Sequence, residues 1–307
     1  MAEISVGEAV GEGFSLIRRQ PLAVMAWGLL QIGLMALAFT LMAPVYASVF
    51  GQAMRQGQGA AIAPADLQRM MQAQSVIYLF DIASLAVGAV TACAVFRAVL
   101  HPDQSRFAYL RLGPAELYLG LLILVGAFAL GIGVFVAMIP IMIVVFSLVA
   151  LHAGAVAAIF GVVAGIAAIV VLFYLVLRIS LVGPMMVDEG RFRLTEAWAL
   201  TRGKVAGLLA IALLLLLIIM AVELVLGVLL VALGFGAVAV LAGGLQNLPV
   251  LLRQPPQAIL GRLAPLLVVM GLIWIPLAGC FSAIMSAPWA RAYRDLRPRR
   301  DIAETFA

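Results

Sequence analysis

The chain has 307 residues, of which 65% are hydrophobic and only 11% are charged, and its formal net charge is +5. A soluble domain has about 45–50% apolar and about 25% charged residues, so this composition excludes a soluble globular fold and indicates that a bilayer surrounds most of the chain. The basic excess does not require a nucleic acid partner, because membrane proteins carry surplus Lys and Arg in their cytoplasmic loops.

The first segment is predicted to be a short helix that lies at the membrane surface. Ser5 and Glu8 have the spacing of a capping box. Apolar residues then recur at helical spacing on one face, at Val6, Val10, Phe14 and Ile17. The opening MAEISVGEAV has no basic stretch and no small-residue cleavage site, so we expect no signal peptide to be removed.

Six apolar runs reach the length of about 20 residues that a membrane helix requires. They lie at 22–47, 75–98, 115–140, 154–182, 205–233 and 264–288. From Leu117 to Leu177 the only side chain that can carry a charge is His152. One helix of that length would measure roughly 90 Å, so we expect the chain to turn between Pro140 and Gly154. The fold class predicted is an all-α polytopic membrane protein with six transmembrane helices.

The basic residues predict the orientation of these spans. Of the 19 Lys and Arg residues, 15 fall before the first span, in the connectors after the second and fourth spans, or after the last span. The other four fall in the alternate loops, at Arg55, Arg69, Arg253 and Arg262. Because basic loops stay cytoplasmic, both termini are expected on the cytoplasmic side.

The segments that enter the odd-numbered spans resemble one another. They read FSLIRRQPLAVMAWGLL, FAYLRLGPAELYLGLL and WALTRGKVAGLLAIALL. Each has an aromatic residue followed four positions later by an arginine, namely Arg18, Arg111 and Arg202. This spacing predicts a single membrane domain, 1–307, built from internal repeats at 5–98, 103–182 and 190–291. Each repeat would be a short interfacial amphipathic helix followed by a hairpin of two spans.

The second and third interfacial helices have their own boundary signals. Asp103 is predicted to cap the second helix, which would end at Gly113. Thr195 is predicted to cap the third helix, which would end at Gly203.

Three arginines end the even-numbered spans, at Arg97, Arg178 and Arg291. One interpretation is that they extend to the headgroup region as ordinary flanking residues. The other is that they and the arginines of the interfacial helices (Arg18, Arg111, Arg202) bind lipid phosphates. The charged connector after Arg178 contains candidates for ion pairs that fix its shape. They are Asp188, Glu189, Arg191 and Arg193. The two acids could pair with Arg178 or with Arg193.

Two carboxylates lie within predicted spans, Asp81 and Glu223. Because a charged group in the bilayer is costly, such residues are either protonated hydrogen-bonding groups or parts of a proton or cation relay. The two histidines, His101 and His152, are expected on opposite sides of the membrane and so cannot share a metal ion or a catalytic triad. We predict no catalytic residue, no metal site and no cofactor. The motif GVVAG at 161–165 is typical of close helix packing.

The charged connector carries a family resemblance. An arginine-ended span followed by VGPMMVDEG and LTEAWALTRGK, together with the later SAPWARAYRDL, resembles the membrane domain found ahead of some bacterial glycerophosphodiester phosphodiesterases. It is also similar to related six-span inner-membrane proteins. The specific part covers 178–204 and 286–296. The resemblance implies a fold, a bacterial inner-membrane location and proximity to lipid; the phosphodiesterase domain is not expected, because no long soluble segment is present.

These observations predict a non-enzymatic inner-membrane protein that binds or organises phospholipid at the cytoplasmic leaflet. Its expected partners are membrane phospholipids, chiefly anionic ones, and other membrane proteins, with no nucleic acid. One alternative is a proton-coupled transporter of a small solute or lipid that uses Glu223 and Asp81. The other is an accessory subunit of a larger membrane complex.

Overall fold

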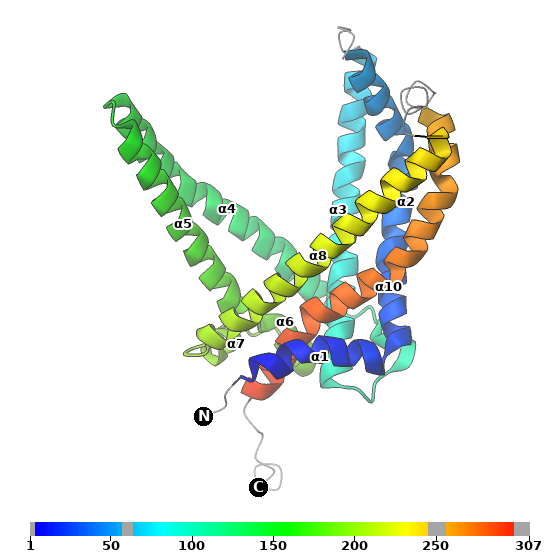
Figure 1. Cartoon of the computed structure of the whole chain (residues 1–307). Helices are drawn as coiled ribbons and strands as arrows, with labels where there is room; N and C mark the ends of the chain where they lie inside the picture. The colour runs from blue at the N-terminus through cyan, green and yellow to red at the C-terminus, as the bar shows by residue number, and fades with distance from the viewer. Residues whose placement is uncertain (1–3, 57–63, 245–255, 298–307) are drawn as a thin grey trace, which may run out of the picture. The chain divides into compact units, whose positions relative to one another are not determined.

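The computed structural model describes residues 4–56, 64–244 and 256–297 (Figure 1). In these residues the regular structure is helical throughout, with no strand. The elements in chain order are α1 (Val6–Arg19), α2 (Pro21–Gln56), α3 (Pro64–Leu100), the 3-10 helix η1 (Arg106–Tyr109), α4 (Pro114–Ala150), α5 (Gly154–Ile179), α6 (Val182–Glu189), α7 (Leu194–Leu200), α8 (Val205–Ala242) and α10 (Pro256–Leu296).

Six segments of the described chain are long and apolar enough to cross a membrane. They are Pro21–Met42, Gln74–Leu100, Arg106–Ala150, Gly154–Glu189, Val205–Gly236 and Ala264–Leu296. The prediction of six spans is confirmed on length and composition, and the chain is a multi-pass membrane protein.

The turn expected between Pro140 and Gly154 is present. Helix α4 continues through Pro140 to Ala150, and α5 begins at Gly154. The N–H of Ala153 donates to the carbonyl of Leu148 at 2.9 Å, and the N–H of His152 donates to Val149 at 3.0 Å. With His152 in the left-handed region at φ 57°, this is the pattern of a Schellman helix end. The turn therefore satisfies carbonyls that α4 would otherwise leave unpaired.

The chain divides into two compact units. The connector unit comprises Met1–Leu16, Ala89–Leu213 and Ile284–Ala307, and the span unit comprises Ile17–Gly88 and Leu214–Ala283. The connector unit contains α4 to α7 with the polar segments around them. The span unit contains α2, the first part of α3 (64–88), the last part of α8 (214–242) and the first part of α10 (256–283).

Within the span unit, α2 and α10 cross with their backbones in contact. A Cβ atom built on Gly28 would lie 1.8 Å from the carbonyl oxygen of Ile275, and one on Gly279 would lie 2.0 Å from that of Val24. Only glycine fits at such a crossing. One turn further along α2, Gln31 Nε2 donates to Ser282 Oγ at 2.6 Å. The crossing therefore combines close packing with a polar contact.

Within the connector unit, α4 and α5 leave their shared turn as an antiparallel pair (green in Figure 1). Gly161 of α5 faces Val145 of α4, whose Cγ2 would lie 3.3 Å from an added Cβ. Gly133 of α4 faces Leu172 in the same way at 3.4 Å. Gly165, the other glycine of the GVVAG motif, has no such neighbour, so only half of that motif lies at a helix contact.

The connectors differ from the sequence predictions in two places. Where a helix was expected from Asp103 to Gly113, the chain forms only η1, with Phe107, Ala108 and Tyr109 in left-handed conformations. In this turn the side chain of Arg97 from α3 donates to the carbonyl of Tyr109, a tertiary contact that competes with local helix formation. The third helix begins at Leu194 after Arg193, so Thr195 lies inside α7 and does not cap it.

Helix α6 was not anticipated as a separate element. Its first five residues, 182–186, are buried. A Cβ atom on Gly183 would lie 3.0 Å from Cε2 of Phe96 and 3.3 Å from Cδ1 of Leu119, so a glycine lets α6 approach α3 and α4 closely. Gly190 ends the helix at φ 68°, with its N–H donating to Met186. This apolar packing fixes the position of the charged residues that follow.

Candidate functional site

Arg97, at the end of α3, is held by a neighbouring acid. Its Nη2 pairs with Oε1 of Glu116, and both side chains are buried. Its Nη1 donates to the carbonyl of Tyr109 at 3.1 Å. The other carboxylate oxygen of Glu116 accepts from the N–H of Gly113 at 3.0 Å. The guanidinium is therefore neutralised inside the protein, and its partners fix the segment that enters α4.

Arg291, near the end of α10, is also paired. Its Nη2 lies 2.7 Å from Oε2 of Glu8, and its Nη1 lies 3.6 Å from Oε2 of Glu12. On its own helix, Nε lies 3.2 Å from Asp295. Arg294 adds a second cation 3.8 Å from Glu12. These contacts join the end of the last described helix to α1.

Arg178, at the end of α5, is different. It is only 6% exposed, yet within the residues that the structure describes no carboxylate pairs with it. Its Nη1 donates to Thr201 Oγ1 at 3.2 Å, and its guanidinium carbon lies 4.3 Å from the ring centre of Trp198, a cation–π contact. Its Nε is buried with no hydrogen-bond partner. Arg178 contacts neither Asp188 nor Glu189.

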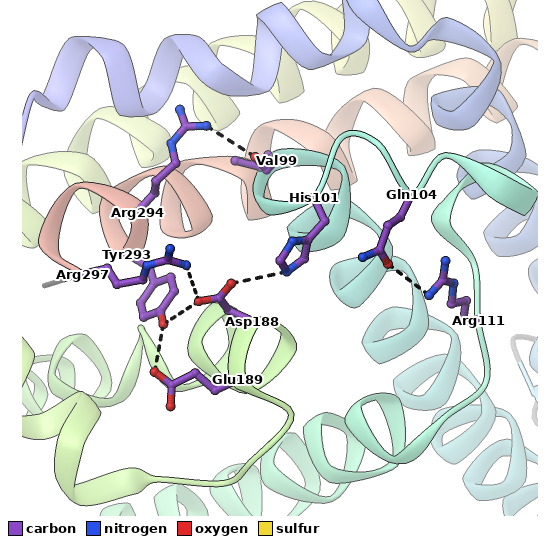
Figure 2. A network of polar contacts seen from close by, with 9 residues as sticks. All are labelled: Val99, His101, Gln104, Arg111, Asp188, Glu189, Tyr293, Arg294 and Arg297. Carbon is purple, nitrogen blue, oxygen red and sulfur yellow. Dashed lines mark hydrogen bonds and ion pairs between the residues drawn. The ribbon is translucent and has the colours of Figure 1, made fainter. Parts of the chain in front are cut away.

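A second polar network surrounds Asp188 (Figure 2). One carboxylate oxygen lies 3.3 Å from Nε2 of His101. The other accepts from Arg297 Nη1 at 2.6 Å and from the Tyr293 hydroxyl at 3.1 Å. The Tyr293 hydroxyl also lies 3.3 Å from Glu189. The network joins α6, the end of α10 and the segment after α3.

The remaining connector residues are more exposed. Arg193 pairs with Glu196 at 2.7 Å and, less closely, with Glu189 at 3.8 Å. The hydrogen bond that Arg193 donates to Glu196, together with the negative charge of Glu196, raises the pKa of Arg193 above its ordinary value, so this guanidinium stays charged. Arg111 donates to Gln104 at 3.1 Å. In the part of the chain that the structure covers, Arg18, Arg191 and Arg202 have no hydrogen bond or ion pair through their side chains.

The two predicted intramembrane carboxylates lie in the span unit, on α3 and α8. Asp81 and Glu223 are exposed. Among the described residues neither has a hydrogen bond or an ion pair. Glu223 and its apolar neighbours on the same helix line a shallow surface, with no basic residue among them. The described residues contain no group of three or more His, Cys, Asp or Glu side chains that could hold a metal ion.

Several residues of the site were missed by reasoning from the sequence. Glu116 had a signal, because a glutamate three residues after Gly113 and just past a proline is typical of a helix start. Thr201 had none beyond its position one turn after Trp198. Tyr293 and Arg297 meet Asp188 across 105 and 109 positions, a distance at which a single sequence gives no pairing signal.

In chemical terms, the described residues of the connector unit include fixed carboxylates, one buried cation without a carboxylate partner, and exposed basic residues, all next to the ends of apolar helices. Guanidinium groups are donors suited to phosphate and carboxylate groups. No family model, no curated protein and no solved structure matches the chain.

Proposed function

We propose that this is a non-enzymatic protein of the bacterial inner membrane that binds anionic phospholipid at the cytoplasmic leaflet. The observation that carries the proposal is that the connector unit contains basic side chains with no carboxylate partner among the described residues. Seven carboxylates have basic partners there, at Glu8, Glu12, Glu116, Asp188, Glu189, Glu196 and Asp295. Among the described residues of this unit, six cations have no carboxylate partner: Arg106, Arg111, Arg178, Arg191, Arg202 and Lys204.

The surroundings of these cations favour lipid over a soluble ligand. They flank the ends of α4, α5 and α8, whose side chains along the spans are mostly exposed apolar groups. Each Lys or Arg near an anionic leaflet contributes about 1 kcal/mol of attraction. A basic surface next to lipid-facing helices therefore fits phospholipid headgroups better than a free anion.

The proposal includes an arrangement of three hairpins, each entered through an interfacial segment. Each even-span arginine contacts the segment that enters an odd span: Arg97 contacts Tyr109, Arg178 contacts Thr201, and Arg291 contacts Glu8. This cyclic pattern supports a threefold repeat. Exposed aromatic and apolar side chains on these segments, such as Phe14 and Phe107, suit helices and turns in the headgroup layer. The resemblance to the membrane domain of phosphodiesterases supports the same lipid context.

The experiment is lipid competition followed by native mass spectrometry. Full-length protein in mild detergent is mixed with equal amounts of phosphatidylglycerol and phosphatidylcholine, and the lipid molecules retained per chain are counted. We expect phosphatidylglycerol to be retained several-fold more often, with the preference falling as salt is raised because exposed charges are screened. Equal retention of the two lipids would contradict the proposal.

The proposed orientation is tested by cysteine labelling. In a variant in which Cys93 and Cys280 are replaced, single cysteines at positions 104 and 191 should react only with reagent on the cytoplasmic side. Single cysteines at positions 60 and 255, which lie outside the described residues, should react only from the opposite side. The physical reason is the retention of basic loops in the cytoplasm. The reversed pattern would invert the topology and with it the leaflet of the proposed site.

Proton-coupled transport is the second candidate, favoured by the exposure of Glu223 and Asp81 on apolar helices. A carboxylate that titrates during a cycle needs access to water or to a partner in one of its states. The third possibility, an accessory subunit, is favoured by the same feature, because an unpartnered acid on an apolar face can meet a basic or hydroxyl group of another membrane protein.

Glu223→Gln separates transport from a structural role. If Glu223 carries protons, the variant should lose proton flux in proteoliposomes while its yield and thermal stability stay close to wild type. If Glu223 only donates or accepts a hydrogen bond, Gln should behave like wild type, and Glu223→Leu should lose about 0.6 to 2 kcal/mol. A wild-type protein with no flux above that of empty liposomes would rule out the transport candidate.

A further inference from the structure

The three even-span arginines are not equivalent, and the difference singles out Arg178. Arg97 and Arg291 each have a carboxylate within the connector unit. Arg178 is 6% exposed and, among the described residues, has none. Burying a cation without an anion is strongly unfavourable. An arginine in this state is stabilised when an anion from outside the chain completes its coordination.

The donors of Arg178 are arranged for such an anion. Nη1 is used by Thr201 Oγ1 at 3.2 Å, and the Thr201 hydroxyl itself donates to the carbonyl of Arg178 or of Trp198, at 3.2 and 3.0 Å. Nε is buried with no acceptor, and within the described chain Nη2 has none either. The Nε–Nη2 edge is the edge that binds two oxygens of a phosphate at once.

The neighbouring side chains add positive charge and a cover. Arg202 and Lys204 directly follow Thr201, and in the described residues neither pairs with a carboxylate. Trp198 lies over the guanidinium and is itself 37% exposed. The site is thus cationic, and the partly exposed ring of Trp198 lies against one face of the guanidinium.

The exterior of α5 indicates what carries the phosphate. Leu175, Tyr174 and Val171 precede Arg178 by three, four and seven positions, so they share its face of the helix. All three are exposed. An apolar stripe that ends at a guanidinium fits an acyl chain with a phosphate at its end. A free phosphate ion would make no use of the stripe.

We propose that Arg178, with Trp198 and Thr201, binds the phosphate of one membrane phospholipid per chain, with the acyl chains along the exposed stripe of α5. This inference rests on the proposed function and narrows it from a basic surface to one site. Arg97 and Arg291 are then structural residues, and the exposed cations supply only general attraction.

The test compares Arg178→Gln with Arg193→Gln in full-length protein stripped of lipid in mild detergent. Arg193 is the matched control, a partly exposed cation on the same connector whose charge is already paired with Glu196 at 2.7 Å. Affinity for phosphatidylglycerol is measured by native mass spectrometry. Arg178→Gln should bind about tenfold more weakly, the loss expected for a charge-assisted hydrogen bond, and Arg193→Gln should stay within about twofold of wild type.

Thermal stability gives a second readout that a structural role would not reproduce. Without lipid, Arg178→Gln should melt at or above the wild-type temperature, because the uncompensated charge is gone. Added phosphatidylglycerol should raise the melting temperature of wild type and not that of the variant. If Arg178→Gln does not fold, Arg178→Lys replaces it in the test. Lysine keeps the charge but loses the two-donor edge, so this variant should bind phosphatidylglycerol several-fold more weakly than wild type.

The outcomes that overturn the inference are distinct. Unchanged affinity in Arg178→Gln, or a melting temperature that falls equally with and without lipid, removes this site but leaves the anionic-lipid function in place. Equal stabilisation by inorganic phosphate or glycerol phosphate at the same concentration makes a free phosphate the ligand and overturns the lipid assignment. No preference of the wild type for phosphatidylglycerol over phosphatidylcholine removes both proposals.

Discussion

Glu116→Ala is expected to lower the free energy of unfolding by about 3–5 kcal/mol, the cost of leaving a buried charge without its partner. Glu116 is the carboxylate that neutralises Arg97, and it also accepts the N–H of Gly113 at the start of α4. Its loss leaves the guanidinium of Arg97 buried, and among the described residues the carbonyl of Tyr109 is then its remaining hydrogen-bond partner. The measurement is reversible unfolding in mixed micelles, followed by circular dichroism.

Two controls separate the charge effect from packing. The double variant Arg97→Met with Glu116→Leu removes both charges and should be within about 1 kcal/mol of wild type, because an apolar pair can replace a buried ion pair. Glu196→Ala breaks the exposed pair with Arg193 and should cost less than about 1 kcal/mol. A double variant as unstable as Glu116→Ala would show that shape, not charge, is what the pair provides.

Gly279→Ala is expected to destabilise the protein by about 3 kcal/mol, at the upper end of the usual cost of overpacking. The added Cβ would lie 2.0 Å from the carbonyl oxygen of Val24. Backbone cannot rotate away as a side chain can, so α2 and α10 must separate, and the hydrogen bond from Gln31 to Ser282 is stretched with them. Gly28→Ala should act in the same direction from the other side of the crossing.

Gly271→Ala is the matched control for this crossing. Gly271 lies on α10 too, and nothing lies within 4 Å of the position of its Cβ. Alanine favours a helix over glycine by roughly 0.8–1 kcal/mol in soluble proteins, so this variant should be neutral or slightly stabilised. If Gly279→Ala and Gly271→Ala lowered the melting temperature equally, the destabilisation would come from the loss of glycine flexibility in α10 and not from the close crossing.

The number of spans and the turn after α4 followed from the sequence, because both depend on local composition. The length of the apolar run from Leu117 to Leu177 forced a reversal, and Gly154 marked where a new helix starts. The short helices were harder. Asp103 and Gly113 have the right spacing for a helix, yet the segment forms a left-handed turn held by Arg97, and that contact is not visible in local sequence.

The candidate site was predictable only in its residue types. Arg97, Arg178 and Arg291 occupy similar positions in the sequence, so nothing local distinguishes them. Their partners in the fold distinguish them. Arg97 lies beside Glu116, and Arg291 lies beside Glu8 and Glu12. Arg178 lies beside Trp198. These partners depend on tertiary packing. The sequence identifies three similar arginines, but only the fold shows that Arg178 is buried with no carboxylate partner among the described residues.

The pairing of Arg291 with Glu8 has a consequence for how the protein is made. The two residues are 283 positions apart, so on the ribosome α1 is synthesised long before its basic partner exists. Glu12 faces Arg291 and Arg294 in a mostly buried position. The contacts of Glu8 and Glu12 with Arg291 and Arg294 can therefore form only after α10 has been synthesised. A nascent chain stalled before that point would hold α1 without its contacts to α10, so the packing of the connector unit is completed only once α10 is in place.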